Sequence, residues 1–259
     1  MYKAKTYNVG HNGSGLLSSI ERARLTNFIV GNKPYVYLLQ EFFKGLGKVE
    51  DFLDELNLDA DKDDTWKVSF RYKNDPGIPG KKNQRGRRTA PKPDALILWH
   101  EKHWTAIKSA AGWTSNSENA YCHVDEDGRQ EKWDELKKDL RLAVQILCPR
   151  VNGENRPSLQ DSMPLPGSVI FASYHGPKGF DRESLNLVLS YTLRLSETCK
   201  CGMIMGTDLN EDILNSGPKR IYDIIDGMRS RESTPDGTKL EVKVRTANTV
   251  CLSSSGPSR

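Results

Sequence analysis

The sequence of 259 residues contains no long hydrophobic run and no leader-like N-terminus. A membrane-spanning helix needs about 20 consecutive apolar residues, and no segment approaches that length, so we expect no transmembrane helix. The first residues, Met-Tyr-Lys-Ala-Lys, lead straight into strand-like sequence rather than into the apolar stretch of a signal peptide. We therefore expect an intracellular protein, located in the nucleus or the cytoplasm.

Cysteine is scarce and follows no framework. The five cysteines are an odd number, and Cys199-Lys200-Cys201 has no second Cys or His pair at the spacing of a structural zinc site. An intracellular protein keeps such residues as thiols. We expect neither a disulfide scaffold nor a structural zinc ion, and we expect five reduced cysteines: Cys122, Cys148, Cys199, Cys201 and Cys251.

A glycine-rich phosphate loop is also missing. The nearest candidate, Gly10-His11-Asn12-Gly13-Ser14-Gly15, matches neither the dinucleotide fingerprint nor the P-loop. This argues against a doubly wound nucleotide-binding sheet. The content of 36% hydrophobic and 28% charged residues is typical of a globular protein that can bury a proper core.

The net charge of +4 is unevenly distributed. Residues 81–92 carry six basic side chains and no acidic one, a pattern that fits contacts to a phosphate backbone, a solvated loop, or a nuclear-localisation signal. The first reading makes nucleic acid the expected partner. The basic residues are Lys81, Lys82, Arg85, Arg87, Arg88 and Lys92.

Apolar patterning predicts several buried strands and a few helices. Strands are expected over Tyr2–Val9, Tyr35–Gln40, Thr65–Tyr72, Asp94–His100, His103–Ile107, Arg141–Leu147, Ser168–Tyr174 and Met203–Gly206. Helices are expected over Leu16–Asn32, Val49–Leu58, Arg182–Cys199 and Ile221–Met228. Some strands follow one another directly and others alternate with helices. This order predicts an α/β sandwich of two face-to-face sheets with helices outside.

Polar side chains stand where four of the apolar runs end: Asn8, Gln40-Glu41, His175, and Asp208 with Asn210. Strand ends are where a rigid sheet can hold such groups in fixed geometry. Hydrolysis of a phosphodiester needs charge stabilisation on the phosphate, an activated water and a proton for the leaving oxygen. These residue types can supply all three requirements.

Each of these residues has a candidate role. Glu41 suits Mg²⁺ as a hard ligand, with Mn²⁺ as an alternative ion, and Asn8 can add a neutral oxygen or orient Glu41. Asp208 can accept a proton from the attacking water, and Asn210 can hold the phosphate or Asp208. His175 can bind a phosphate oxygen or deliver a proton. The alternatives are a turn or helix cap at Asp208 and Asn210 and a structural role for His175.

Four motifs in order resemble the exonuclease–endonuclease–phosphatase superfamily, most closely its deoxyribonuclease I-like branch. They are Tyr7-Asn8-Val9, Leu38-Leu39-Gln40-Glu41, Ser173-Tyr174-His175-Gly176-Pro177 and Gly206-Thr207-Asp208-Leu209-Asn210, and Asp94–Trp99 is similar to an intervening strand. The resemblance spans about residues 2–212. It implies a four-layer α/β/β/α sandwich forming a single domain over residues 1–259, and a divalent-metal-dependent phosphoesterase with Glu41 as metal ligand.

The sequence departs from that branch at three places. The branch has a glutamate partner for its first histidine just after the strand that corresponds to Trp66–Ser69, where Phe70-Arg71 stand here. It has an arginine two positions after the metal-binding glutamate, where Phe43 stands here. The superfamily ends on a strand with a Ser-Asp-His triplet that does not occur in this sequence. We therefore expect the domain to be C-terminally incomplete, without its last strands.

Two kinds of function follow from these expectations. The first is a metal-dependent phosphodiesterase, foremost a nuclease that hydrolyses DNA or RNA, with a lipid or inositol phosphate as the alternative substrate. The second is a catalytically impaired homologue that acts as a binding protein. Endonuclease and exonuclease action both stay open as modes of hydrolysis.

Overall fold

The computed structural model describes residues 4–10, 16–32, 35–58, 60, 64–70, 93–106, 141–150, 167–178, 181–199 and 201–210. Contacts divide the chain into two compact units, residues 1–211 and 212–259, and all described residues belong to the first unit. The single domain over 1–259 stays a prediction. The predicted helix Ile221–Met228 and the basic residues 81–92 lie outside the described residues.

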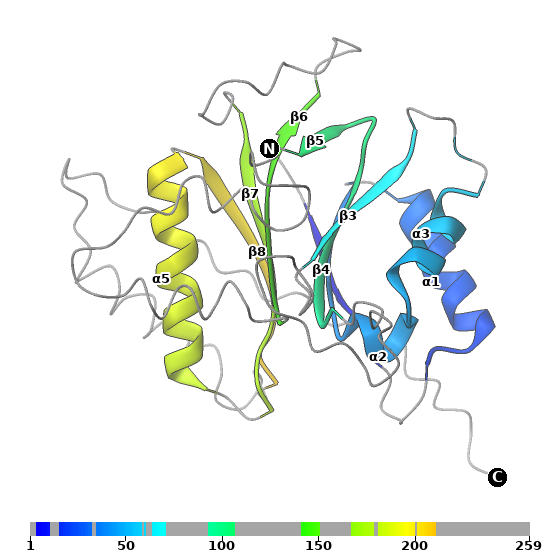
Figure 1. Ribbon diagram of the computed structural model, residues 1–259, viewed down its shortest axis with the longest axis horizontal. Coiled ribbons are helices and arrows are strands. Elements are labelled where there is room, and N and C mark those ends of the chain that lie inside the picture. The colour runs from blue at the N-terminus through cyan, green and yellow to red at the C-terminus, as the bar shows by residue number, and fades with distance from the viewer. Residues whose placement is uncertain are drawn as a thin grey trace, which may run out of the picture. The chain divides into compact units, whose positions relative to one another are not determined.

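Two four-stranded sheets form the first unit (Figure 1). Sheet A has the order β1-β2-β4-β3, with β1 (Lys5–Asn8), β2 (Val36–Gln40), β4 (Ala95–His100) and β3 (Trp66–Phe70). Sheet B has the order β5-β6-β7-β8, with β5 (Trp104–Ala106), β6 (Leu142–Pro149), β7 (Val169–His175) and β8 (Gly202–Asp208). Strands β2 and β4 of sheet A contact β6, β7 and β8 of sheet B, so the sheets pack face to face.

Helices cover the two outer faces. On sheet A lie α1 (Ser19–Gly31), α2 (Phe42–Leu46) and α3 (Val49–Leu56), and on sheet B lies α5 (Arg182–Cys199) (Figure 1). The layers therefore run helix, sheet, sheet, helix, and the predicted four-layer α/β/β/α sandwich is confirmed. None of the described helices is both long and apolar enough to cross a membrane.

Each sheet contains one parallel pair of strands joined by a helix. In sheet A the unit is β1-α1-β2, with Asn8 opposite Gln40, and in sheet B it is β7-α5-β8, with His175 opposite Asp208. The other described pairings are antiparallel. Because the two strands of a parallel pair run in the same direction, both of their carboxyl ends reach one edge of the sheet.

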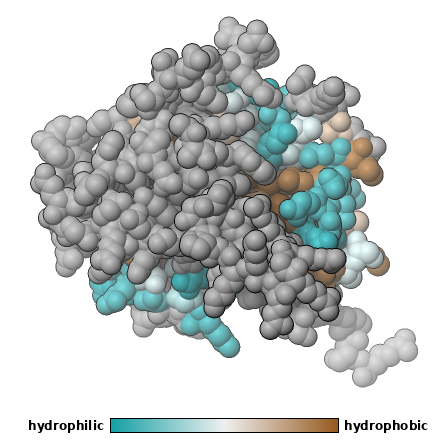
Figure 2. All heavy atoms as spheres, viewed as in Figure 1, coloured by the Kyte–Doolittle hydropathy of each residue, from teal (hydrophilic) through white to brown (hydrophobic). Residues whose placement is uncertain are grey.

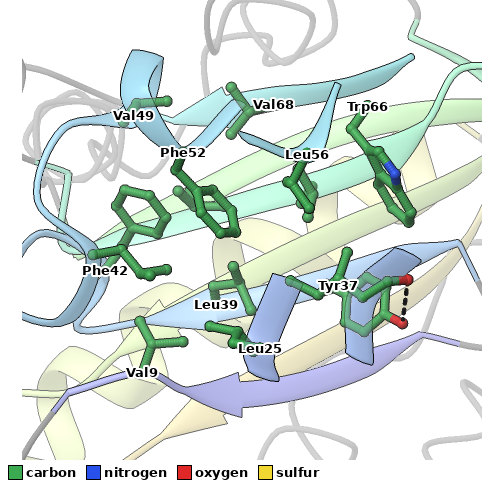
Figure 3. Close-up of a cluster of buried hydrophobic side chains, with 14 of the residues drawn as sticks. Val9, Leu25, Tyr37, Leu39, Phe42, Val49, Phe52, Leu56, Trp66 and Val68 are labelled. Atoms are coloured by element: carbon green, nitrogen blue, oxygen red, sulfur yellow. Dashed lines mark hydrogen bonds between the residues drawn. The ribbon is translucent and has the colours of Figure 1, made fainter. Parts of the chain in front are cut away.

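The outer face of sheet A packs against its helices through a large apolar cluster (Figure 3). Leu25 and Ile29 are the buried residues of α1, and Val49, Phe52 and Leu56 are those of α3. Their i, i+3, i+4 and i+7 spacing places them on one side of each helix. The buried Tyr37 belongs to this cluster, and its hydroxyl donates to the carbonyl groups of Ile29 (3.2 Å) and Asn32 (3.0 Å).

The inner faces of the two sheets enclose a second apolar cluster. Sheet A contributes Val36, Leu38, Ala95, Ile97 and Trp99, and sheet B contributes Trp104, Ala143, Leu147, Val169 and Phe171. Period-two alternation along each strand directs these residues to the interior. Trp99 and Trp104 are therefore core residues.

Several predicted boundaries are wrong. The helix predicted from Leu16 begins at Ser19, because Ser18 and Glu21 form a capping box that fixes the first turn. Leu16, which precedes the helix, and Ile20, which lies within it, are both exposed, and Figure 2 shows apolar side chains at the surface on the side that carries α1 and α3. Strands β6 and β8 are longer than predicted, and the short helix α2 was not predicted.

Candidate functional site

The carboxyl ends of the four parallel strands carry four of the predicted site residues. Asn8, His175 and Asp208 are the last residues of β1, β7 and β8, and Glu41 directly follows β2. Ligands of α/β sheets bind outside such carboxyl ends. Side-chain contacts join the sheets at this edge: the Asn8 amide donates to Asp208 Oδ2, and Glu41 Oε1 lies 3.3 Å from His175 Nε2.

Glu41 occupies a sharp turn between β2 and α2. Its φ of 53° lies in the left-handed region, which a non-glycine residue adopts at a cost of about 1–3 kcal/mol. The turn is held on both sides, because the Glu41 carbonyl accepts from Gly45 N (3.2 Å) and the next residue, Phe42, donates its N–H to the Asp94 carbonyl (3.2 Å). The turn directs the Glu41 side chain toward sheet B, so that its carboxylate lies beside His175.

Gly10 makes room for that carboxylate. A Cβ atom built on Gly10 would lie 1.8 Å from Glu41 Oε2 and 2.8 Å from Glu41 Cβ, well inside van der Waals contact. The Gly10 N–H is itself fixed, since it donates to Asn8 Oδ1 (2.7 Å). Asn8 therefore holds the backbone against which Glu41 rests, in addition to its bond to Asp208.

His175 is buried and forms a dyad with Asp94. His175 Nδ1 lies 2.8 Å from Asp94 Oδ2. The backbone N–H of His175 donates to the Arg141 carbonyl (2.8 Å). A carboxylate can only accept, so Nδ1 carries the hydrogen in this pair. Nε2 then faces the site, 3.0 Å from Asn210 Nδ2 and 3.3 Å from Glu41 Oε1.

The surrounding charges favour the protonated form of His175. Burial acts to lower the pKa of this imidazole, but the hydrogen bond and charge of Asp94, with the charges of Glu41 and Asp208, outweigh it and raise the pKa above its ordinary value of 6.5. When protonated, the ring has an N–H at Nε2 that can point to Glu41 or to a bound anion. The histidine is therefore equipped to donate a proton near neutral pH.

Asp208 and Asn210 close the site from sheet B. Asp208 accepts from Asn8 at Oδ2 and from the Asn210 N–H at Oδ1 (2.9 Å), and its carbonyl accepts from Gly176 N (2.6 Å). Asn210 has a φ of 53°, a conformation that asparagine tolerates better than most residues. Its Nδ2 donates to the Gly176 carbonyl (2.9 Å) and approaches His175. The turn that follows β8 thus binds both Asp208 and His175 in place.

Asp94 is the site residue that the sequence analysis missed. It stands just before β4, and the antiparallel register of β4 with β2 pairs Ala95 with Gln40. This register brings Asp94 beside Glu41, and the packing of the sheets brings it to His175. In this chain Asp94, directly before β4, is the carboxylate that contacts His175 Nδ1.

The donor set at the site suits a hard divalent cation. Glu41, Asp208 and Asn8 offer carboxylate and amide oxygens, the ligands that Mg²⁺ takes together with water. The Glu41 side chain itself fills the space that Gly10 leaves, so the glycine fixes where this carboxylate lies. Within the part of the chain that the structure describes, no group of three or more His, Cys, Asp or Glu side chains is placed to hold a metal ion. The metal site at Glu41 and Asn8 therefore stays a prediction.

The structure thus brings together Asn8, Glu41, His175, Asp208 and Asn210, the five residues predicted for the catalytic and metal roles, and adds Asp94. Their proximity is a finding, and their roles remain predictions. The predicted phosphate-binding residues Lys81, Lys82, Arg85, Arg87 and Arg88 lie outside the described residues.

No protein-family model matches the sequence, and no curated protein matches it. Several solved structures match the chain, and two of them are described here. The endonuclease domain of TRAS1, a telomere-specific non-LTR retrotransposon, is 10% identical with a TM-score of 0.40, covering 88% of this chain and 72% of that one. An endonuclease/exonuclease/phosphatase family protein from Bacteroides thetaiotaomicron is 9% identical with a TM-score of 0.44, covering 87% of this chain and 68% of that one.

Proposed function

We propose that this protein is a divalent-metal-dependent phosphodiesterase that hydrolyses nucleic acid. One observation carries the proposal: Asn8, Glu41, His175, Asp208 and Asn210 form a continuous set of contacts at the carboxyl ends of four parallel strands. The set combines a metal-suited carboxylate, a histidine with a raised pKa, and amide donors. These are the components that phosphodiester hydrolysis requires.

The metal would be held by Glu41, with oxygens of Asp208 and Asn8 available beside it. When bound, Mg²⁺ or Mn²⁺ would neutralise charge on the phosphate and make a coordinated water more acidic. Glu41 is suited to hold such an ion in one place, because the positive-φ turn and Gly10 fix the direction of its carboxylate.

The remaining residues handle protons and the phosphate. Asp208 is fixed from two sides by Asn8 and Asn210, so it can accept a proton from the attacking water in a defined direction. His175, held by Asp94 through Nδ1, presents Nε2 as a donor to a phosphate or leaving-group oxygen. The Asn210 amide lies beside Nε2 and can contact the same oxygen.

The sequence supports a polyanionic substrate. The chain has a net charge of +4, and residues 81–92 carry six basic residues without an acidic one. Lys and Arg side chains that contact phosphates contribute affinity without reading the base sequence. We therefore propose DNA or RNA as substrate and expect binding to weaken steeply with salt.

The test uses the purified chain with plasmid DNA, single-stranded DNA, RNA and a chromogenic phosphodiester, each with Mg²⁺, with Mn²⁺ and with EDTA. We expect metal-dependent release of product and a loss on the order of 10²-fold or more for Glu41→Gln, as for removal of a group that acts in a concerted site. Glu50→Gln, at an exposed glutamate in the first turn of α3, is the matched control and should retain full activity. Absence of product from all four substrates with either metal would overturn the proposal.

A further inference from the structure

The interior between the two sheets changes from apolar to polar just before the strand ends that carry the site. Along β2 and β7 the inward residues Val36, Leu38, Val169 and Phe171 belong to the apolar cluster between the sheets. The next inward residues on these strands, Gln40 and Ser173, are polar and only 1% and 0% exposed. Burial of a polar group is costly unless the group is hydrogen-bonded, so these two residues stand there for a reason other than core packing.

Gln40 is fully engaged by partners from three other strands. Its Nε2 donates to Ser173 Oγ on β7 (2.9 Å), and also approaches the carbonyl groups of Leu38 (3.1 Å) and Gly206 on β8 (3.4 Å). Its Oε1 accepts from Thr6 Oγ1 on β1 (3.2 Å). A single side chain therefore ties β2 to both parallel strands of sheet B and to its own neighbour in sheet A.

Two further observations indicate a fixed spacing between the sheets at this level. Ser173 Oγ donates to the Leu39 carbonyl (3.0 Å), so a second hydrogen bond crosses between the sheets in the opposite direction. Gly206 allows close approach, because a Cβ atom there would lie 2.6 Å from Thr6 Oγ1 and 2.9 Å from a methyl group of Leu38. We call Thr6, Gln40, Ser173 and Gly206 the register layer.

The register layer lies directly beneath the site. Three of its members stand two residues before a site residue on the same strand, and the fourth directly precedes one. Side chains two residues apart on a strand face the same side. The pairs along the chain are Thr6 with Asn8, Ser173 with His175, Gly206 with Asp208, and Gln40 with Glu41.

We propose that Gln40 and the register layer are positioning residues, which set the distance from Glu41 to His175 and from Asn8 to Asp208. The inference rests on the proposed function of the site. Apolar contacts between sheets fix separation but tolerate sliding, whereas several directional hydrogen bonds hold one lateral register. Because a displacement of about 1 Å in a reacting site can lower a rate by about 10²-fold, that register matters for the chemistry.

The test compares Gln40→Met and the milder Ser173→Ala with Leu147→Ala. Leu147 is fully buried between the same two sheets, but it pairs with Val169 at the end of β7 opposite to His175. At a temperature at which all variants are folded, we expect kcat to fall on the order of 10- to 100-fold in the register-layer variants, with KM little changed. The affinity for Mn²⁺, measured by calorimetry, should fall in the same two variants. Leu147→Ala should retain the kcat and the Mn²⁺ affinity of the unmodified chain.

A measurement without substrate or metal separates this inference from the proposed function. The side-chain amides of Asn8 and Asn210 report the site directly by NMR, because both donate hydrogen bonds within it. Gln40→Met and Ser173→Ala should shift and broaden these signals, and Leu147→Ala should not. If the unmodified chain is inactive, the proposed function fails and these amide signals alone decide the inference. Unchanged signals in both register-layer variants, or equal kcat losses in all three variants, would overturn it.

Discussion

Replacement of Asp94 by asparagine tests the electrostatic basis of the site most directly. The change retains the size of the side chain and the backbone carbonyl that accepts from Phe42 N, but it removes the charge 2.8 Å from His175 Nδ1. The two side chains are 25% and 7% exposed, so solvent screens the pair only weakly. A hydrogen bond to a charged group contributes about 1.5–3 kcal/mol to stability, and we expect a loss of unfolding free energy in that range at acidic pH.

The loss should depend on pH with a defined sign. The folded state raises the pKa of His175 above its ordinary value of 6.5. The protonated histidine therefore contributes its full stabilisation below pH 6.5, and this stabilisation is lost as the pH rises through the raised pKa. The difference between the unmodified chain and Asp94→Asn should therefore be largest at acidic pH and shrink at alkaline pH. Denaturant unfolding of the metal-free protein in EDTA measures it on both sides of the transition.

Activity gives the second measurement of the same variant. Without Asp94 the pKa of His175 should fall, since the opposing effect of burial then acts with less compensation. We expect kcat to drop by about 10²-fold, within the usual range for a misplaced acid–base group. Asp54→Asn, at an exposed residue of α3, is the control and should change neither quantity. A pH-independent stability difference together with unchanged kcat would refute the assigned role of Asp94.

Three further changes test other parts of the structure. Gly10→Ala should displace the Glu41 carboxylate and destabilise the fold by about 1–3 kcal/mol. It should also abolish Mg²⁺ binding measured by calorimetry. The control is Gly31→Ala, whose Cβ would meet nothing within 4 Å and which should be neutral or stabilising. Burial raises the pKa of Tyr37 to about 12 from 10.0, so stability should fall as pH rises through this interval, and Tyr37→Phe should flatten that fall in alkaline denaturation. Ser18→Ala removes the capping box of α1 and should cost about 1 kcal/mol in thermal or denaturant unfolding without changing kcat. Equal Mg²⁺ affinities in the two glycine variants, or unchanged alkaline unfolding in Tyr37→Phe, would contradict these expectations.

The strands and most of the site could be predicted because local sequence determines both. Val36–Gln40 and Val169–His175 are buried along their whole length, so each reads as an apolar run that ends on a polar residue. Four such ends, at Asn8, at Gln40-Glu41, at His175 and at Asp208 with Asn210, suggested the site. Their meeting across the two sheets is a tertiary fact that no local pattern contains.

The missed features depend on long-range register or on close packing. Asp94 looks like an ordinary residue before a strand, and only the pairing of Ala95 with Gln40 brings it to the site. The short helix α2 contains Gly45, a poor helix former, which is required because a Cβ there would lie 1.9 Å from the Val9 carbonyl oxygen. The start of α1 is a different case. Ser18 and Glu21 have the spacing of a capping box in the sequence, but the apolar spacing that begins at Leu16 favoured an earlier start.

The hydrogen bond between Asn8 and Asp208 joins residues 200 positions apart in the chain. Contacts of such large sequence separation require closure of a long loop, and that entropy must be overcome before the contact stabilises anything. The β1-α1-β2 and β7-α5-β8 units can each form from short-range contacts, but neither contains a complete site. During refolding, secondary structure should therefore recover before catalysis. The proposed site is complete only once the most distant described segments of the chain have met.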